Sequence, residues 1–192
     1  MQFTDLLRPD MFFLQIGAND GVRRDPIRKY ILELHWRGVL VEPIPGVFAS
    51  LVSNYSGVAG LQFENAAVCN TNGKVKFFIH PKHSDCSGLK VRTRKQKRTT
   101  MVESEVSAIT FESLLVKYGI QQLDLLQLDA EGFDFEIIKT VPFPQMRPGI
   151  LRYEHKHIDN AACMRYLADW GYSFMHEKND TVAFLHPRAS TL

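Results

Sequence analysis

Short apolar runs alternate with helical patterns along most of this chain of 192 residues, and several of the runs end in glycine or an acid. The first run, Phe12–Ile16, stops at the glycine turn of residues 17–21, and a helical pattern starts near Asp25. Strands that are separated by helices favour right-handed crossovers between parallel neighbours. We therefore predict an α/β fold, a three-layer sandwich with helices on both faces of one sheet.

The remaining elements follow from apolar periodicity and turn residues. Further strands are predicted at 39–41, 61–64, 123–128, 150–153, 172–175 and 182–185, and helices at 47–55, 110–118, 134–139 and 160–170. The turn at residues 178–180 indicates that the last two strands form an antiparallel hairpin. The expected sheet is mostly parallel, seven-stranded and Rossmann-like, with an antiparallel last strand.

One segment, residues 74–106, breaks the alternation. Residues 74–79 follow an Asn-Gly turn and predict a hairpin strand, whereas 80–106 are polar, charged and weakly periodic, which predicts a loop or lid. Residues 90–98 carry six positive charges, either as a solvated face or as a means of recruiting an anionic substrate or carrier. We expect a single domain over 1–192 with this hairpin and basic lid inserted.

Composition excludes several classes of protein. A chain with 45% hydrophobic residues can bury a core without help, and 23 Lys and Arg against 21 Asp and Glu give no global reason to expect nucleic acid or a membrane as partner. Three widely separated cysteines do not make a disulfide framework. With no apolar window of the ~18 residues that span a bilayer, we expect a cytoplasmic protein.

Two strand ends point to a nucleoside ligand, because open parallel sheets bind ligands beyond the carboxyl ends of their strands. Gly17, Asn19 and Gly21 form a tight turn that can bring backbone N–H groups close to a ligand. Glu42 ends the second strand, roughly 20 residues later, where an acid can hold a ribose diol. Each feature alone fits a plain turn or a surface acid; together they specify an adenosine-type ligand.

Two further strand ends carry acids and an imidazole. Asp129 and Glu131 follow one strand, and Glu154 and His155 follow the next, so adjacent parallel strands would bring them together. His155 is the candidate general base, oriented by Glu154 or Asp129; the alternative is a histidine hydrogen-bonded at a loop edge. Asp129 and Glu154 could instead bind Mg²⁺ or Mn²⁺, unless backbone N–H groups and a lysine offset the acids.

These residues resemble the FkbM-type S-adenosylmethionine-dependent methyltransferases, which have the class I methyltransferase fold. The resemblance covers about residues 11–186. It rests on the motifs FLQIGANDG, LVEP, FENAAVCNTNGKVKFF, SDCSGLK and, as the most specific match, LLQLDAEGFDFEII together with Glu154. Gln15 departs from the family pattern, which more often has an acid there, and a neutral side chain could weaken contacts to the methionine part of the cofactor.

The resemblance implies roles for individual residues. Cofactor contacts would come from Gln15, Gly17, Asn19 and Gly21 near the methionine and ribose, from Glu42 on the ribose hydroxyls, and from Asn65 and Ala66 beside the adenine. Asp129 and Glu131 would face the sulfonium and the substrate. Family acceptors are hydroxyl groups of sugars, polyketides or other small metabolites, so the implied reaction is O-methylation.

Two other functions are compatible with parts of the sequence. A non-catalytic domain that binds an adenosine cofactor, as a regulator or a relic, would keep the turn and Glu42 but perform no transfer; the intact Asp129, Glu131, Glu154 and His155 argue against it. An NAD-dependent oxidoreductase would need a second, substrate-binding domain, for which this chain has no room. Oligomeric state is not encoded in any readable pattern.

Overall fold

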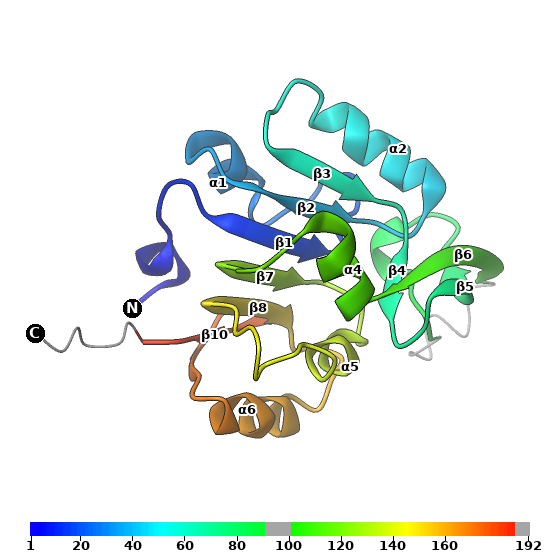
Figure 1. Cartoon of the computed structure of the whole chain (residues 1–192). Helices are drawn as coiled ribbons and strands as arrows, with labels where there is room; N and C mark the ends of the chain where they lie inside the picture. The colour runs from blue at the N-terminus through cyan, green and yellow to red at the C-terminus, as the bar shows by residue number, and fades with distance from the viewer. Residues whose placement is uncertain (91–100, 187–192) are drawn as a thin grey trace, which may run out of the picture.

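A computed structural model describes residues 1–90 and 101–186 (Figure 1). The helices are the short 3₁₀ segments η1 (Phe3–Leu6) and η2 (Ser84–Cys86) and the α-helices α1 (Arg28–Glu33), α2 (Pro45–Asn54), α4 (Phe111–Tyr118), α5 (Asp134–Ile138) and α6 (Asn160–Asp169). The strands are β1 (Phe12–Ile16), β2 (Arg37–Val41), β3 (Leu61–Glu64), β4 (Ala67–Cys69), β5 (Gly73–Ile79), β6 (Val102–Thr110), β7 (Leu125–Leu128), β8 (Ile150–Glu154), β9 (Ser173–His176) and β10 (Asp180–Phe184).

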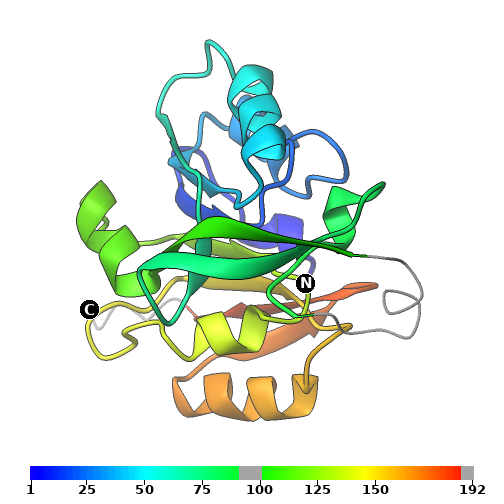
Figure 2. The same ribbon diagram turned by 90° about the vertical axis from the view of Figure 1, so that its right-hand side faces the viewer.

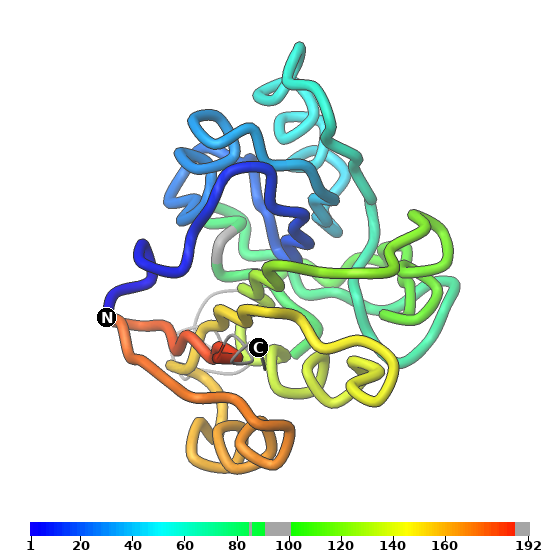
Figure 3. The backbone as a smooth tube through the Cα atoms, turned by 60° about the vertical axis from the view of Figure 1, so that its left-hand side comes forward, coloured from blue at the N-terminus to red at the C-terminus, as the bar shows by residue number. Residues whose placement is uncertain are grey.

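The main sheet has seven strands in the order β3-β2-β1-β7-β8-β10-β9. Neighbours from β3 to β8 pair in parallel, and β10 is antiparallel to both β8 and β9. The strand order reverses between β1 and β7 at the middle of the sheet, so the first part of the chain (blue to cyan) and its last part (yellow to red) lie on opposite sides of this junction (Figure 3). The predicted fold class is confirmed, including the antiparallel last strand.

Successive side chains of each strand face opposite sides of the sheet, so each face builds its own core. In β1, Phe13 packs into a cluster with residues of η1, α1 and α2, whereas Leu14 and Ile16 pack into a larger cluster with residues of α4, α5 and α6. Because β1 is buried on both faces, its sequence is a continuous apolar run interrupted only by Gln15. Helices on both faces of the sheet give the three layers.

A second sheet, in the order β4-β6-β5, lies beside the carboxyl ends of the parallel strands (Figures 1 and 2). The sequence interpretation extended the loop from residue 80 to residue 106, but the structure has the strand β6 from Val102. In β6 only Val106 and Ala108 are buried, because this small sheet leaves most of the strand exposed to solvent. A strand with so few buried positions lacks the apolar alternation by which strands are recognised. The short strand β4 was also missed.

Helix boundaries follow local hydrogen-bonding signals. Thr110 begins α4, where its side chain accepts a hydrogen bond from the backbone N–H of Ser113, and Gly119 ends the helix in the left-handed conformation at φ +61°. Before α1, the carboxylate of Asp25 accepts the N–H groups of Ile27 and Arg28. Asp25 therefore lies before the helix and binds its first N–H groups, so α1 starts at Arg28 rather than at Asp25.

The basic cluster predicted at 90–98 lies outside the described residues except for Lys90. The ammonium of Lys90 is 5.5 Å from the centroid of the Phe133 ring. Within 1–90 and 101–186, none of the helices has the length and apolar character to cross a membrane.

Candidate functional site

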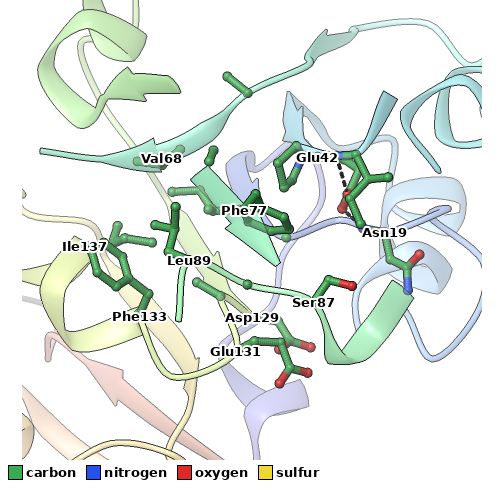
Figure 4. Close-up of a pocket in the computed structure, with 18 of the residues that line it drawn as sticks. Asn19, Glu42, Val68, Phe77, Ser87, Leu89, Asp129, Glu131, Phe133 and Ile137 are labelled. Atoms are coloured by element: carbon green, nitrogen blue, oxygen red, sulfur yellow. Dashed lines mark hydrogen bonds between the residues drawn. The ribbon is translucent and has the colours of Figure 1, made fainter. Parts of the chain in front are cut away.

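A cavity of about 640 Å³, including its open mouth, lies where the parallel strands end and the small sheet begins. Its walls come from the turns after β1, β2 and β7, from β4 and β5, and from the segment 84–89. Apolar side chains, among them Val68, Leu89, Phe133 and Ile137, gather on one side, and Asn19 and Ser87 lie on the other (Figure 4). The cavity therefore suits a ligand with an apolar ring at one end and hydrogen-bonding groups at the other.

Gly17 allows the turns after β1 and β7 to meet at the floor of the cavity. Its φ is +81°, and a Cβ atom at this position would lie 2.0 Å from the backbone oxygen of Asp129. No residue with a side chain fits this approach without moving one of the two turns. Gly17 thus brings Asp129 to the first turn, which explains on steric grounds why glycine occurs there.

Glu42, at the end of β2, is held in one orientation by two backbone donors. The N–H of Asn19 donates to its Oε2 (3.0 Å), and the N–H of Ile44 donates to its Oε1 (2.9 Å). The residue is 5% exposed and lines the cavity. Since each carboxylate oxygen has a second lone pair, both can still accept a hydroxyl of a ligand. Figure 4 shows the bond between Glu42 and the turn of Asn19.

The electrostatics of Glu42 favour a ligand that donates hydrogen bonds. The pKa of Glu42 is raised to about 7, mainly by burial and to a smaller extent by the charge of Asp20, while the N–H groups of Ile44 and Asn19 lower it. A buried carboxylate whose ionised form is disfavoured gains when hydroxyl donors reach it. The paired hydroxyls of a ribose are donors of this kind.

Other residues expected at the cofactor lie around the cavity rather than in its wall. The amide of Asn65 donates to the backbone oxygens of Glu42 (2.7 Å) and Pro43 (3.2 Å), so it holds the turn that carries Glu42. Gln15 is buried on the face covered by α1 and α2, where it hydrogen-bonds Asp25. Gly21 leaves room for Leu51 and Tyr55. Of the expected set, Gly17, Asn19, Glu42, Ala66 and Asp129 line the cavity.

The turn after β7 presents Asp129 and Glu131 side by side (Figure 4). The buried carboxylate of Asp134 accepts the N–H groups of Ala130 (3.2 Å) and Gly132 (3.0 Å) and so fixes the turn from behind. Glu131 adopts a left-handed φ of +52°, and Asn19 on the opposite wall has +49°. Such conformations are uncommon for residues other than glycine and cluster at ligand-binding sites.

Negative charge is concentrated around Asp129. The side chain of Asp129 is exposed toward the cavity. Even so, the surrounding protein reduces the solvation of its carboxylate, and this loss of solvation is the largest cause that raises its pKa well above the usual range. The charges of Asp134, Glu131 and Glu154 raise the pKa further. Asp129 is therefore a stronger proton acceptor than an ordinary aspartate.

The imidazole that joins this group is His157, not His155. Oxygen atoms of Glu131 and Glu154 and a ring nitrogen of His157 all lie within 4.8 Å of one another. His155 instead has its Nδ1 3.0 Å from the hydroxyl of Thr181, with its ring against that of His176. Glu154 thus meets Glu131 as the sequence predicted, but the expected position of His155 beside them is wrong.

The cavity wall also contains residues to which the sequence analysis gave no role in the site. They are Ile16, Pro43, Ile44, Ala67, Val68, Phe77, Ser84, Ser87, Gly88, Leu89, Ala130, Phe133 and Ile137. Phe77 is both buried in the core of the small sheet and part of the wall. The motif SDCSGLK was the available signal for the segment 84–89, where the hydroxyl of Ser84 donates to the side-chain oxygen of Asn19 (3.1 Å).

An open parallel sheet whose strand order reverses between β1 and β7, with a glycine turn after β1 and an acid after β2, is an architecture that binds nucleotide ligands at the carboxyl ends of its strands. The model of the methyltransferase FkbM domain matches residues 15–174 of this chain. The chain therefore belongs to the FkbM family of S-adenosylmethionine-dependent methyltransferases. No curated protein matches it.

Solved structures of methyltransferases share the fold. Methyltransferase FkbM of Methylobacillus flagellatus KT superposes with a TM-score of 0.58 at 12% identity, over 94% of this chain and 45% of that protein. Precorrin-6y C5,15-methyltransferase of Geobacter metallireducens GS-15 gives 0.51 at 13% identity, over 94% and 82%. Fibrillarin of Aeropyrum pernix, solved with natively bound S-adenosyl-L-methionine, gives 0.50 at 11%, over 93% and 67%. This chain spans less than half of the Methylobacillus protein.

Proposed function

We propose that this chain is an O-methyltransferase that transfers the methyl group of S-adenosylmethionine to a hydroxyl of a small metabolite in the cytoplasm. The observation that carries the proposal is the cavity with Glu42 in one wall and Asp129 with Glu131 in another. Glu42 is fixed by backbone donors and suits a sugar diol. Asp129 and Glu131 lie together in the wall where an acceptor would have to be deprotonated.

The residues present fit S-adenosylmethionine. Its adenine would occupy the apolar side of the cavity, near Ala66, Val68 and Ile137, and its ribose would donate to Glu42. The methionine part would run past Asn19 toward Asp129 and Glu131.

The bound cofactor supplies an electrophilic methyl group that passes in line to the acceptor oxygen, with release of S-adenosylhomocysteine. The chain positions the two reactants and excludes water from between them. The hydroxyl proton must be removed as the new C–O bond forms, and the raised pKa of Asp129 suits this task. His157, which lies with Glu131 and Glu154, is the second group able to accept the proton.

The acceptor is proposed from the family resemblance, which implies sugars, polyketides or similar hydroxyl compounds, anionic or carrier-bound ones included. The nearly balanced charge, +2 for the whole chain, supports a metabolite over a nucleic acid, which would require a strong positive surface. Fibrillarin, which shares the fold, is described in one structure as a pre-rRNA processing protein, so RNA belongs in any test of acceptors.

The test measures transfer of an isotope-labelled methyl group from S-adenosylmethionine to a panel of sugars, polyketides, hydroxy acids and a structured RNA. Binding of S-adenosylhomocysteine is measured in parallel by calorimetry, with Glu42→Gln as the variant and Glu136→Gln, an exposed acid of α5, as the matched control. Loss of a charge-assisted hydrogen bond of roughly 1.5–3 kcal/mol should weaken binding to Glu42→Gln by about tenfold or more.

The outcomes separate the candidate functions. Labelled methyl ether from a small hydroxyl compound supports the proposal. Transfer to RNA alone would overturn the substrate class, and binding without transfer to any acceptor would favour the non-catalytic alternative. Equal affinities of Glu42→Gln and Glu136→Gln for S-adenosylhomocysteine would show that Glu42 does not bind the ribose.

A further inference from the structure

We propose that Glu131, Glu154 and His157 form a binding site for one divalent metal ion, which holds the acceptor of methyl transfer through two of its oxygens. The inference deepens the proposed function and rests on it. The three side chains come from separate places: Glu131 from the turn after β7, Glu154 from the end of β8, and His157 from the turn that follows β8.

The distances among the three side chains are close to those around a bound ion. One ligand atom of each lies within 4.8 Å of the other two. Ligands at about 2.1 Å from an ion stand up to about 4.2 Å apart when they lie on opposite sides of it. The three atoms therefore have to move closer together when an ion binds, by rotation of these half-buried side chains.

The charge around the site favours a cation. Glu131 and Glu154 lie near Asp129, and Asp134 and Asp180 are close enough to add to the negative field there. Several carboxylates in one region repel one another unless protons or a cation offset them. The combination of two carboxylates and one imidazole suits Mn²⁺ or Fe²⁺, since all-oxygen sites are typical of Mg²⁺ and Ca²⁺.

The position of the site connects the ion to the reaction. Glu131 lines the cofactor cavity beside Asp129, so an ion held by it would stand at the edge where the acceptor meets the methyl group. Three protein ligands leave three positions of an octahedron open, and two of them can take adjacent oxygens of one acceptor. The substrate class that this geometry selects is a vicinal diol or an α-hydroxy acid.

The ion would act by lowering the pKa of the bound hydroxyl, because a Lewis acid stabilises the alkoxide. The proton is then released to water, the alkoxide oxygen bonds to the methyl carbon, and the carbon–sulfur bond breaks. In this arrangement Glu131, Glu154 and His157 bind the ion and none of them is the base.

The experiment titrates the full chain with Mn²⁺ and follows free Mn²⁺ by electron paramagnetic resonance, with S-adenosylhomocysteine present. The variant His157→Ala is compared with His155→Ala, whose imidazole lies two residues away but contacts Thr181. We expect one Mn²⁺ per chain, an affinity at least about tenfold weaker in His157→Ala, and an unchanged affinity in His155→Ala. Glu154→Gln serves as a second ligand variant, and circular dichroism checks that each variant is folded.

Two results would overturn the metal site. One is the absence of Mn²⁺ binding at millimolar concentration, and the other is an equal effect of the two histidine variants. The proposed function is judged separately, by binding of S-adenosylhomocysteine and by methyl transfer after exhaustive chelation. Full transfer without metal would leave the methyltransferase proposal standing and assign proton removal to Asp129 or His157. Failure to bind S-adenosylhomocysteine would overturn both the proposed function and the metal site that rests on it.

Discussion

At the scale of single residues, the site depends on groups held in unfavourable states. Glu42 is a buried carboxylate with a pKa near 7, and Gly17, Asn19 and Glu131 have left-handed backbone conformations around the same cavity. For Asn19 and Glu131 this conformation is strained, and it persists only where the surrounding structure enforces it. The raised pKa of Glu42 and the close approach of the backbone at Gly17 can each be tested by substitution against a control.

Affinity for S-adenosylhomocysteine should rise with pH through 7. Ribose hydroxyls donate to the ionised form of Glu42, so bound ligand lowers the pKa of Glu42 below about 7, and below that value the protein must lose a proton in order to bind. Between pH 8 and pH 6 we expect the association constant to fall by up to about tenfold, since each pKa unit corresponds to 1.36 kcal/mol. Calorimetry at several pH values measures this change. A profile of Glu42→Gln as steep as that of the wild type would show that another group titrates.

Gly17→Ala should be far more harmful than Gly57→Ala. Both glycines have a φ of +81°, but the space around Gly57 is open, whereas a Cβ at Gly17 would overlap the backbone oxygen of Asp129. Gly57→Ala isolates the cost of the left-handed conformation, about 1–2 kcal/mol. Gly17→Ala adds the cost of forcing two turns apart, so we expect a loss of about 3 kcal/mol or more in the free energy of unfolding. Equal losses in urea denaturation would mean that the two turns separate easily.

At the scale of elements, the central strands of the main sheet could be predicted because burial on both faces leaves apolar runs in their sequence. The turns after β1, β2 and β7 could be placed for the same reason, since each begins where such a run stops. The strands β4 and β6 could not be predicted, because β4 has only three residues and β6 buries few side chains. Strands of that kind are determined by their neighbours rather than by their own pattern.

The different positions of His155 and His157 show why the direction of a side chain after a strand end could not be predicted from the sequence. His155 continues the alternation of β8 and lies on the same side as Tyr153, toward Thr181 and α6. A turn over residues 156–157 then brings His157 back to the side of Glu154. A histidine at the end of a strand is visible in the sequence, but the face to which the next turn directs it is not.

Arg152 should be the residue that ties β8 to its neighbours. Its guanidinium, little exposed, bonds Gln127 of β7 (3.2 Å), Asp180 of β10 (2.7 Å) and Glu177 in the turn between β9 and β10 (2.7 Å). Removing one partner of a buried ion pair costs about 3–5 kcal/mol, and the partly exposed acids place Arg152→Met near the lower end. Arg147→Met, at an exposed arginine, is the control and should cost little. Similar unfolding free energies for both variants would show that the polar row adds no stability.

At the scale of the whole molecule, the cavity joins parts of the fold that are far apart in the chain. Its wall includes residues from β1 to β5, from the segment 84–89 and from the β7–α5 turn, so a ligand there contacts the main sheet, the small sheet and α5 at once. Anything that binds the folded state alone must stabilise all of these parts together. Ligand-induced stability is therefore a direct report on the site.

S-adenosylhomocysteine at about 100 times its dissociation constant should raise the free energy of unfolding by about 2.7 kcal/mol. For a chain of this size, that corresponds to an increase in Tm of about 5–10 °C, because 1 kcal/mol shifts Tm by about 2–4 °C. Adenosine should give a smaller increase, since it reaches Glu42 and the apolar wall but not the turn of Asp129. NADH should give less than adenosine, because Asp129 and Glu131 lie where its pyrophosphate would have to pass and would repel its negative charge. Scanning calorimetry with the three ligands checks the order, and stabilisation by NADH beyond that by S-adenosylhomocysteine would contradict the assignment of the cavity to a methyl donor.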